Sequence, residues 1–207
     1  MDDAMVGVVA NPLSGRDIRR LTTRASVFPT AEKANMIQRM LTAFHAVGVQ
    51  RVLLSTDLGG ISAAVFRAIG QRRGQDAGWP DVEFLDGQPI RQNAQDTVDA
   101  VRRMVIAGAS VIICLGGDGT ARVTASAAGD VPMLALSTGT NNAFPVVREA
   151  TIAGLAAGLV ATGAVPADGV VTRAKLLEVR VGDRGQLAQD AGQADHVRFR
   201  ERAEQLG

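Results

Sequence analysis

Residues 111–120 read V-I-I-C-L-G-G-D-G-T, an apolar run that ends in three glycines, an aspartate and a threonine. Apolar residues fill the whole run from Val111 to Leu115, which is typical of a central parallel strand that is buried on both faces. The small residues that follow predict a tight turn, and a helix is expected over about 119–128. The stretch therefore predicts a strand that leads through a glycine-rich loop into a helix.

The same order of strand, loop and helix recurs along the chain. Thr30 and Asn93 are the expected N-caps of two of the helices. Consecutive βα units of this kind predict an α/β fold whose parallel sheet carries helices on both faces. Besides 111–115, the expected strands are 5–10, 51–55, 82–85 and 133–136, and the other expected helices are about 31–47, 61–72, 94–107 and 149–161.

The C-terminal part of the chain has a different pattern. Residues 174–181, A-K-L-L-E-V-R-V, alternate in polarity and predict one more strand. Residues 183–207 are rich in charged residues and glutamine and hold no cluster of large apolar residues, so this strand is expected to lack a partner. We therefore expect an α/β nucleotide-binding domain over 1–172. Residues 173–207 are expected to be the truncated start of a β-rich C-terminal domain or a polar tail.

Composition excludes several classes of protein. The chain has 207 residues, 46% of them hydrophobic, and a net charge of +1, which gives no general attraction to nucleic acid. No apolar stretch reaches the length of about 18 residues that a membrane span needs, and the N-terminus has no signal-peptide pattern, so a cytoplasmic protein is expected. Cys114 is expected to be a buried thiol, and the isolated His45 and His196 cannot build a zinc site.

Three loops that follow expected strands consist largely of glycine, small hydroxyl residues and amides. They are Asn11–Asp17 (N-P-L-S-G-R-D), Gly116–Thr120 (G-G-D-G-T) and Ser137–Asn142 (S-T-G-T-N-N). Ligands of an open parallel sheet bind beyond the carboxyl ends of its strands, where backbone N–H groups and a helix N-terminus favour anions. The loops therefore predict a phosphate site with one carboxylate. Asp118 would serve there as a Mg²⁺ ligand or as the base that takes a hydroxyl proton.

Each loop also has an ordinary explanation. G-G-D-G-T can be a βα turn in which Asp118 caps the next helix, and the other two loops can be simple turns. Neither a G-K-S/T phosphate loop nor a G-x-G-x-x-G dinucleotide fingerprint occurs. Arg19, Arg20 and Arg122 follow two of the loops, and each is a candidate for a phosphate contact or for a solvated surface position.

Together the motifs resemble the NAD kinase and diacylglycerol kinase superfamily. The resemblance rests on G-G-D-G-T after an apolar strand and on an N-P-x-S-G loop after the first strand. T-G-T-N-N-A-F and A-G-L-A-A-G-L-V-A-T-G are most similar to the ATP-NAD kinase-like branch, which includes acetoin catabolism protein X. Over roughly residues 5–181, the resemblance implies a three-layer, Rossmann-like N-terminal domain with a mostly parallel sheet, followed by the start of a β-rich domain.

The activity that this resemblance implies is transfer of the γ-phosphoryl group of ATP to the 2′-hydroxyl of the adenosine ribose of NAD, with Mg²⁺. Nucleotides would then be the partners, and a homo-oligomer is left open. Asp118 would be the catalytic base or the metal-side carboxylate. The residues that would cradle the phosphates and line the cleft are Asn11, Ser14, Gly15, Gly116, Gly117, Gly119, Thr120, Thr138, Gly139, Thr140 and Asn141.

Two alternative functions remain at this point. The resemblance is shared by lipid kinases, so diacylglycerol is an alternative acceptor. The chain contains no Asn-Glu dipeptide, the pair with which NAD kinases hold the NAD ribose, and only the start of a C-terminal domain is expected. A catalytically incomplete nucleotide-binding or regulatory protein is therefore the other alternative. The sequence also leaves open whether polyphosphate replaces ATP as the donor.

Overall fold

A computed structural model describes residues 4–15, 28–72, 78–87, 89–140, 142–174, 176–181, 184–187 and 197–200. The chain divides into two compact units, Met1–Gly169 and Val170–Gly207. Each unit is described by itself below. No helix in these ranges is long and apolar enough to cross a membrane.

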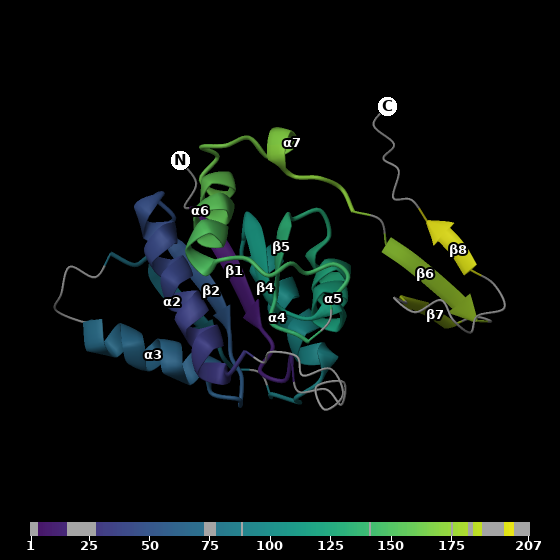
Figure 1. Ribbon diagram of the computed structural model, residues 1–207, viewed down its shortest axis with the longest axis horizontal. Coiled ribbons are helices and arrows are strands. Elements are labelled where there is room, and N and C mark those ends of the chain that lie inside the picture. The colour runs from purple at the N-terminus through teal and green to yellow at the C-terminus, as the bar shows by residue number, and fades with distance from the viewer. Residues whose placement is uncertain are drawn as a thin grey trace. The chain divides into compact units, whose positions relative to one another are not determined.

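The first unit is built on a five-stranded sheet in which every pair of neighbouring strands is parallel (Figure 1). The two central strands, β1 and β4, are buried along their whole length, which explains their continuous apolar sequences. The order is β3-β2-β1-β4-β5, so the chain reverses its direction of growth between β1 and β4. Such a switch point is where open α/β sheets bind their ligands. The strands are β1 (Met5–Ala10), β2 (Arg51–Ser55), β3 (Asp81–Leu85), β4 (Val111–Gly116) and β5 (Met133–Ser137).

Helices cover both faces of this sheet. On one face, α2 (Thr30–Ala46), α3 (Ile61–Arg72) and α6 (Ala150–Ala161) share an apolar core with the strands, and α2 and α6 lie side by side (Figure 1). On the other face, α4 (Ala94–Ile106) and α5 (Asp118–Ala128) form a second core. A short helix, α7 (Ala167–Val170), follows α6. The expected α/β fold with helices on both faces of a parallel sheet is confirmed.

Glycines allow α2 and α6 to approach closely. A Cβ atom on Gly154 would lie 2.9 Å from Ala43 Cβ and 3.0 Å from Met40 Cα. A Cβ atom on Gly158, four residues later on the same face of α6, would lie 2.5 Å from Val47 Cγ2. This close contact explains why the α6 sequence is so rich in glycine and alanine.

One of the two predicted N-caps is confirmed and the other is wrong. Asn93 caps α4 as expected: its side chain accepts a hydrogen bond from Gln95 N at 2.8 Å, and Asp96 accepts one from Asn93 N at 3.3 Å. The expected cap at Thr30 is wrong, because Thr30 is already helical and Pro29 takes the N-cap position without a side-chain bond. Proline fits there because its φ of −60° is fixed by the ring.

The second unit contains a three-stranded antiparallel sheet in the order β7-β6-β8. Its strands are β6 (Leu176–Val181), β7 (Arg184–Leu187) and β8 (Val197–Arg200). The expectation that β6 lacks a partner is therefore wrong, since both of its edges are paired. Backbone hydrogen bonds form such a ladder without a large apolar cluster, and strands of four residues are too short for their periodicity to be recognised.

Candidate functional site

The three loops expected from the sequence meet at the carboxyl ends of β1, β4 and β5. The hydroxyl groups of Ser14 and Thr138 share a hydrogen bond of 2.7 Å, and Asn11 Nδ2 donates to Thr120 Oγ1 at 2.9 Å. Thr138 N donates to Gly116 O at 3.0 Å. These four side chains are buried or half-buried. The loop after β1 therefore contacts both of the other loops at the switch point of the sheet.

The loop after β1 is shaped by its own polar residues. Asn11 Oδ1 accepts a hydrogen bond from Leu13 N at 2.8 Å, which makes a turn typical of asparagine. Ser14 Oγ donates to Asn11 O at 3.0 Å, and Gly15 follows with a φ of +81°. Asn11 N is bonded to Leu115 O at 2.9 Å, which ties the loop to the end of β4. The N-P-L-S-G sequence thus encodes a closed turn that aims two side chains at the neighbouring loops.

Lys33 of α2 lies under this loop, with only 1% of its surface exposed. Its Nζ donates to Asn11 O at 3.0 Å, Pro12 O at 3.3 Å and Ser14 O at 2.9 Å. An ammonium group has three N–H donors, and each of these carbonyl groups can accept a hydrogen bond from it. The loop is therefore folded around a buried cation.

Sequence reasoning missed Lys33. A lysine near the start of an amphipathic helix ordinarily reads as a solvated residue. The one signal was its helical spacing, because a lysine at i shares the face of residues i+3, i+4 and i+7. In α2 those positions are the buried residues Met36, Ile37 and Met40.

Asp118 connects the loop after β4 to the loop after β5. Its carboxylate accepts hydrogen bonds from the backbone N–H of Ala143, at 2.9 Å to Oδ2, and of Phe144, at 2.9 Å to Oδ1. In return, Asn142 Oδ1 accepts from Asp118 N at 3.2 Å. The ordinary explanation, in which Asp118 caps its own helix, is wrong: Gly117 takes the N-cap position, and the carboxylate points to the neighbouring loop instead.

Glycines permit the close approach of these two loops. A Cβ atom on either Gly117 or Gly139 would lie 2.9 Å from Asn142 Oδ1. A Cβ atom on Gly139 would also lie 3.3 Å from Gly117 Cα. Asn142 in turn donates to Ser137 Oγ at 2.6 Å. Asn142 is therefore the residue that fills the space between the two glycines. The sequence indicated it only as part of the S-T-G-T-N-N loop.

Three of the other candidate residues are described by the structure. Thr140, in the loop after β5, and Arg122, in α5, are half-buried. Asn141, Arg19 and Arg20 lie outside the described residues. Among the described residues outside its own helical turn, none has an atom within 4 Å of the place where a Cβ on Gly119, near the start of α5, would stand. The open space beside Gly119 borders the helix N-terminus, where an anion is favoured.

Asp118 is the one carboxylate among the described residues of the three loops. Across all the described ranges, no group of three or more His, Cys, Asp or Glu side chains is arranged to hold a metal. Mg²⁺ usually keeps several water ligands and is held by one or two carboxylates together with substrate phosphates. Asp118 therefore suits a Mg²⁺ ion that binds together with a nucleotide.

Cys114 lies in β4 behind the loops and is a buried free thiol, as expected. Burial raises its pKa to about 11. The thiol is therefore protonated at neutral pH. Because the thiolate is the nucleophile in cysteine chemistry, Cys114 has a packing role in this sheet.

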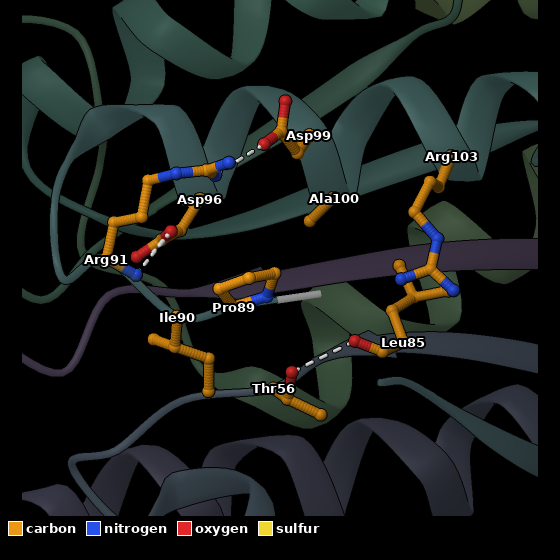
Figure 2. Close-up of a pocket in the computed structure, with 9 residues that line it drawn as sticks. All are labelled: Thr56, Leu85, Pro89, Ile90, Arg91, Asp96, Asp99, Ala100 and Arg103. Carbon is orange, nitrogen blue, oxygen red and sulfur yellow. Dashed lines mark hydrogen bonds and ion pairs between the residues drawn. The ribbon is translucent and has the colours of Figure 1, made fainter. Parts of the chain in front are cut away.

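A small hollow lies at the same edge of the sheet, beside β2 and β3 (Figure 2). Its volume of about 30 Å³ holds no more than a few water molecules. Arg91 donates to Asp99 at 2.9 Å, so these charged groups bond to each other. A nucleotide does not fit this hollow. It is lined by Thr56, Leu85, Pro89, Ile90, Arg91, Asp96, Asp99, Ala100 and Arg103.

Known proteins are similar in sequence to this chain. Residues 6–165 match the family model described as the ATP-NAD kinase N-terminal domain. The chain is 42% identical over 194 residues to acetoin catabolism protein X of Cupriavidus necator, in an alignment that covers 93% of this chain and 54% of that protein. The chain thus spans about half the length of the curated relative that it matches. No solved structure shows significant similarity.

Proposed function

We propose that this chain, which belongs to the ATP-NAD kinase N-terminal domain family, is an ATP-dependent NAD kinase-like phosphotransferase. The product would be NADP, phosphorylated on the 2′-hydroxyl of the adenosine ribose. One observation carries the proposal: Asp118 stands at the N-terminus of α5, where the loops after β1 and β5 contact the loop after β4. The site therefore combines an anion-binding helix end with a carboxylate.

Phosphoryl transfer depends on positioning and on charge neutralisation. The phosphates of ATP would lie beside Gly119, where the open space at the start of α5 admits them. The ribose oxygen would form a bond to the γ-phosphorus, and the bond from this phosphorus to the β–γ bridging oxygen would break. Asp118 would accept the proton that the hydroxyl loses. ADP would leave as the second product.

Mg²⁺ would neutralise the charge of the phosphate oxygens in this site. Asp118 is the side chain that would hold it, because carboxylate oxygens are ligands that Mg²⁺ prefers. In the present structure both carboxylate oxygens accept hydrogen bonds from Ala143 and Phe144. An ionised carboxylate has about four acceptor positions, so these bonds hold Asp118 in place and still leave Oδ2 able to meet a ligand.

The same hydrogen bonds favour a second candidate function. A carboxylate whose role is to hold the loop after β5 would leave a site that binds nucleotides without turnover. The alternative protein would be a nucleotide-binding or regulatory module. Binding alone would raise its melting temperature in the presence of ATP or NAD, because a ligand of the folded state stabilises that state.

The test is formation of NADP from Mg-ATP and NAD by the full chain and by Asp118→Asn. We expect NADP from the wild type and a loss of at least about 100-fold in Asp118→Asn, the usual scale for a general base. Asp81→Asn is the matched control, because Asp81 is an exposed carboxylate at the opposite end of the sheet, in the first position of β3. It should retain full activity.

Other outcomes assign the site differently. A rise in melting temperature with ATP and no NADP would support the nucleotide-binding module. Phosphorylation of diacylglycerol in place of NAD would indicate a lipid kinase. NADP formation that Asp118→Asn leaves unchanged would contradict the role of Asp118.

A further inference from the structure

We infer that Lys33 is a positioning residue for the proposed nucleotide site: its buried ammonium group holds the Asn11–Ser14 loop in the shape that presents Asn11 and Ser14 to the neighbouring loops. Lys33 does not line the cleft itself, because only 1% of its surface is exposed. The inference rests on the proposed function for the identity of the ligand. Its structural part, the shape of the loop, can be tested without any ligand.

Burial of the Lys33 side chain carries a large free-energy cost. Lysine is almost never fully buried, because removing an ammonium group from water is strongly unfavourable unless polar groups compensate. The compensating groups include the carbonyl oxygens of Asn11, Pro12 and Ser14, which lie within 3.3 Å of Nζ. All three belong to one turn. The loop and the lysine therefore stabilise each other.

Two of the residues that bind Lys33 direct their side chains to the neighbouring loops. Asn11 gives its carbonyl oxygen to Lys33 and its side-chain amide to Thr120, at 2.9 Å. The carbonyl oxygen of Ser14 accepts a hydrogen bond from Lys33, and its hydroxyl group shares a hydrogen bond of 2.7 Å with that of Thr138. Lys33 thus fixes the backbone of both residues that join the loop after β1 to the other two loops.

The consequence of removing the ammonium group follows from these contacts. The three carbonyl groups would lose a donor and would turn toward water, since a buried acceptor without a partner is unfavourable. Asn11 Nδ2 and Ser14 Oγ would move with their backbone. Displacements of about 1 Å at a site of this kind can lower its function by as much as about 100-fold. The effect should therefore appear in ligand binding as well as in stability.

The experiment compares Lys33→Met with Ile37→Ala in the full chain. Ile37 lies one turn later on α2 and is equally buried. Truncation of Ile37 therefore destabilises the same core, but it removes no hydrogen-bond donor from the loop carbonyl groups. Amide NMR signals of Leu13, Ser14 and Gly15 should shift in Lys33→Met and remain unchanged in Ile37→Ala. Unchanged loop signals in Lys33→Met would overturn the inference, whatever the ligand.

The binding measurement uses Mg-ATP at a temperature at which all variants are folded. We expect about tenfold weaker binding in Lys33→Met and wild-type affinity in Ile37→Ala. Ethylamine should partly restore binding to Lys33→Ala, because it supplies an ammonium group to the vacated space. Equal affinities in both variants, or no rescue, would reduce Lys33 to a purely structural residue. No binding of Mg-ATP by the wild type would instead refute the proposed function. The amide NMR signals of the loop would then decide whether Lys33 holds the loop in shape.

A further measurement uses the wild-type protein, so it does not depend on whether a variant folds. The chain has two lysines, Lys33 and Lys175, so labelling of lysine Nζ with ¹⁵N gives two side-chain signals. The ammonium hydrogens of Lys33 should exchange slowly with solvent because they are buried and bonded to the loop. Exchange as fast as in free lysine would overturn the inference.

Discussion

At the scale of single residues, Gly119 and Gly139 show how differently two glycines of the site are constrained. A Cβ on Gly139 would lie 2.9 Å from Asn142 Oδ1 and 3.3 Å from the backbone of Gly117, so the protein itself leaves little room for a side chain there. A Cβ on Gly119 would meet no atom within 4 Å from the part of the chain that the structure describes outside its own helical turn. If the protein needs glycine at position 119 for its function, the reason is a ligand that approaches the main chain.

The two alanine variants should therefore separate folding from binding. We expect Gly139→Ala to lower the free energy of unfolding by about 1–3 kcal/mol, because it forces two loops apart. Gly119→Ala should leave that free energy unchanged or raise it by up to about 1 kcal/mol, since alanine favours the helix. Urea unfolding measures both. Gly119→Ala should nevertheless bind Mg-ATP more weakly, and wild-type affinity in this variant would place the phosphates elsewhere.

Cys114 provides a prediction about pH. Burial raises its pKa to about 11, against about 8.5 for an unfolded chain. The folded protein thus keeps a proton that the unfolded chain loses, so stability that is fully present below about pH 8.5 falls as the pH rises toward 11. Urea unfolding between these pH values should show a smaller fall in Cys114→Ala than in the wild type. Equal falls would contradict the assignment.

At the scale of elements, the helix starts of α2 and α4 can be compared directly. Asn93→Ala should lower the free energy of unfolding by about 1 kcal/mol, because it removes the capping box of α4. Thr30→Ala should change it by less than about 0.5 kcal/mol, because Pro29 occupies the N-cap position and no side-chain bond is lost. Thermal unfolding would reveal both. A large loss in Thr30→Ala would contradict the observed helix start.

Local sequence patterns predicted some of the helices and strands and missed others. The buried strands β1 and β4 and the capped helix α4 were predicted because long apolar runs and capping residues are local signals. Pro29 and Thr30 are both common at helix starts, and a local pattern does not choose between them. β7 follows β6 as a hairpin in which Val181 lies opposite Arg184, but β7 and β8 have four residues each, too few for periodicity to reveal them.

At the scale of the whole molecule, the parallel sheet order brings three loops that are far apart in the sequence to one edge. The sequence predicted that meeting from the rule that ligands bind at the carboxyl ends of strands. It did not predict the connections between the loops. Lys33 was missed because its burial depends on the loop above it, and the bonds of Asp118 to Ala143 and Phe144 depend on how β4 and β5 lie side by side.

The most direct test of the account is a map of where Mg-ATP binds the full chain, measured as changes in backbone amide NMR signals. The account predicts changes that cluster at the three loops. Changes confined to the hollow beside β2 and β3, around Arg91 and Ala100, or no changes at all, would contradict it. The amides expected to respond are those of Leu13, Ser14, Gly15, Gly117, Asp118, Gly119, Thr138, Gly139, Ala143 and Phe144.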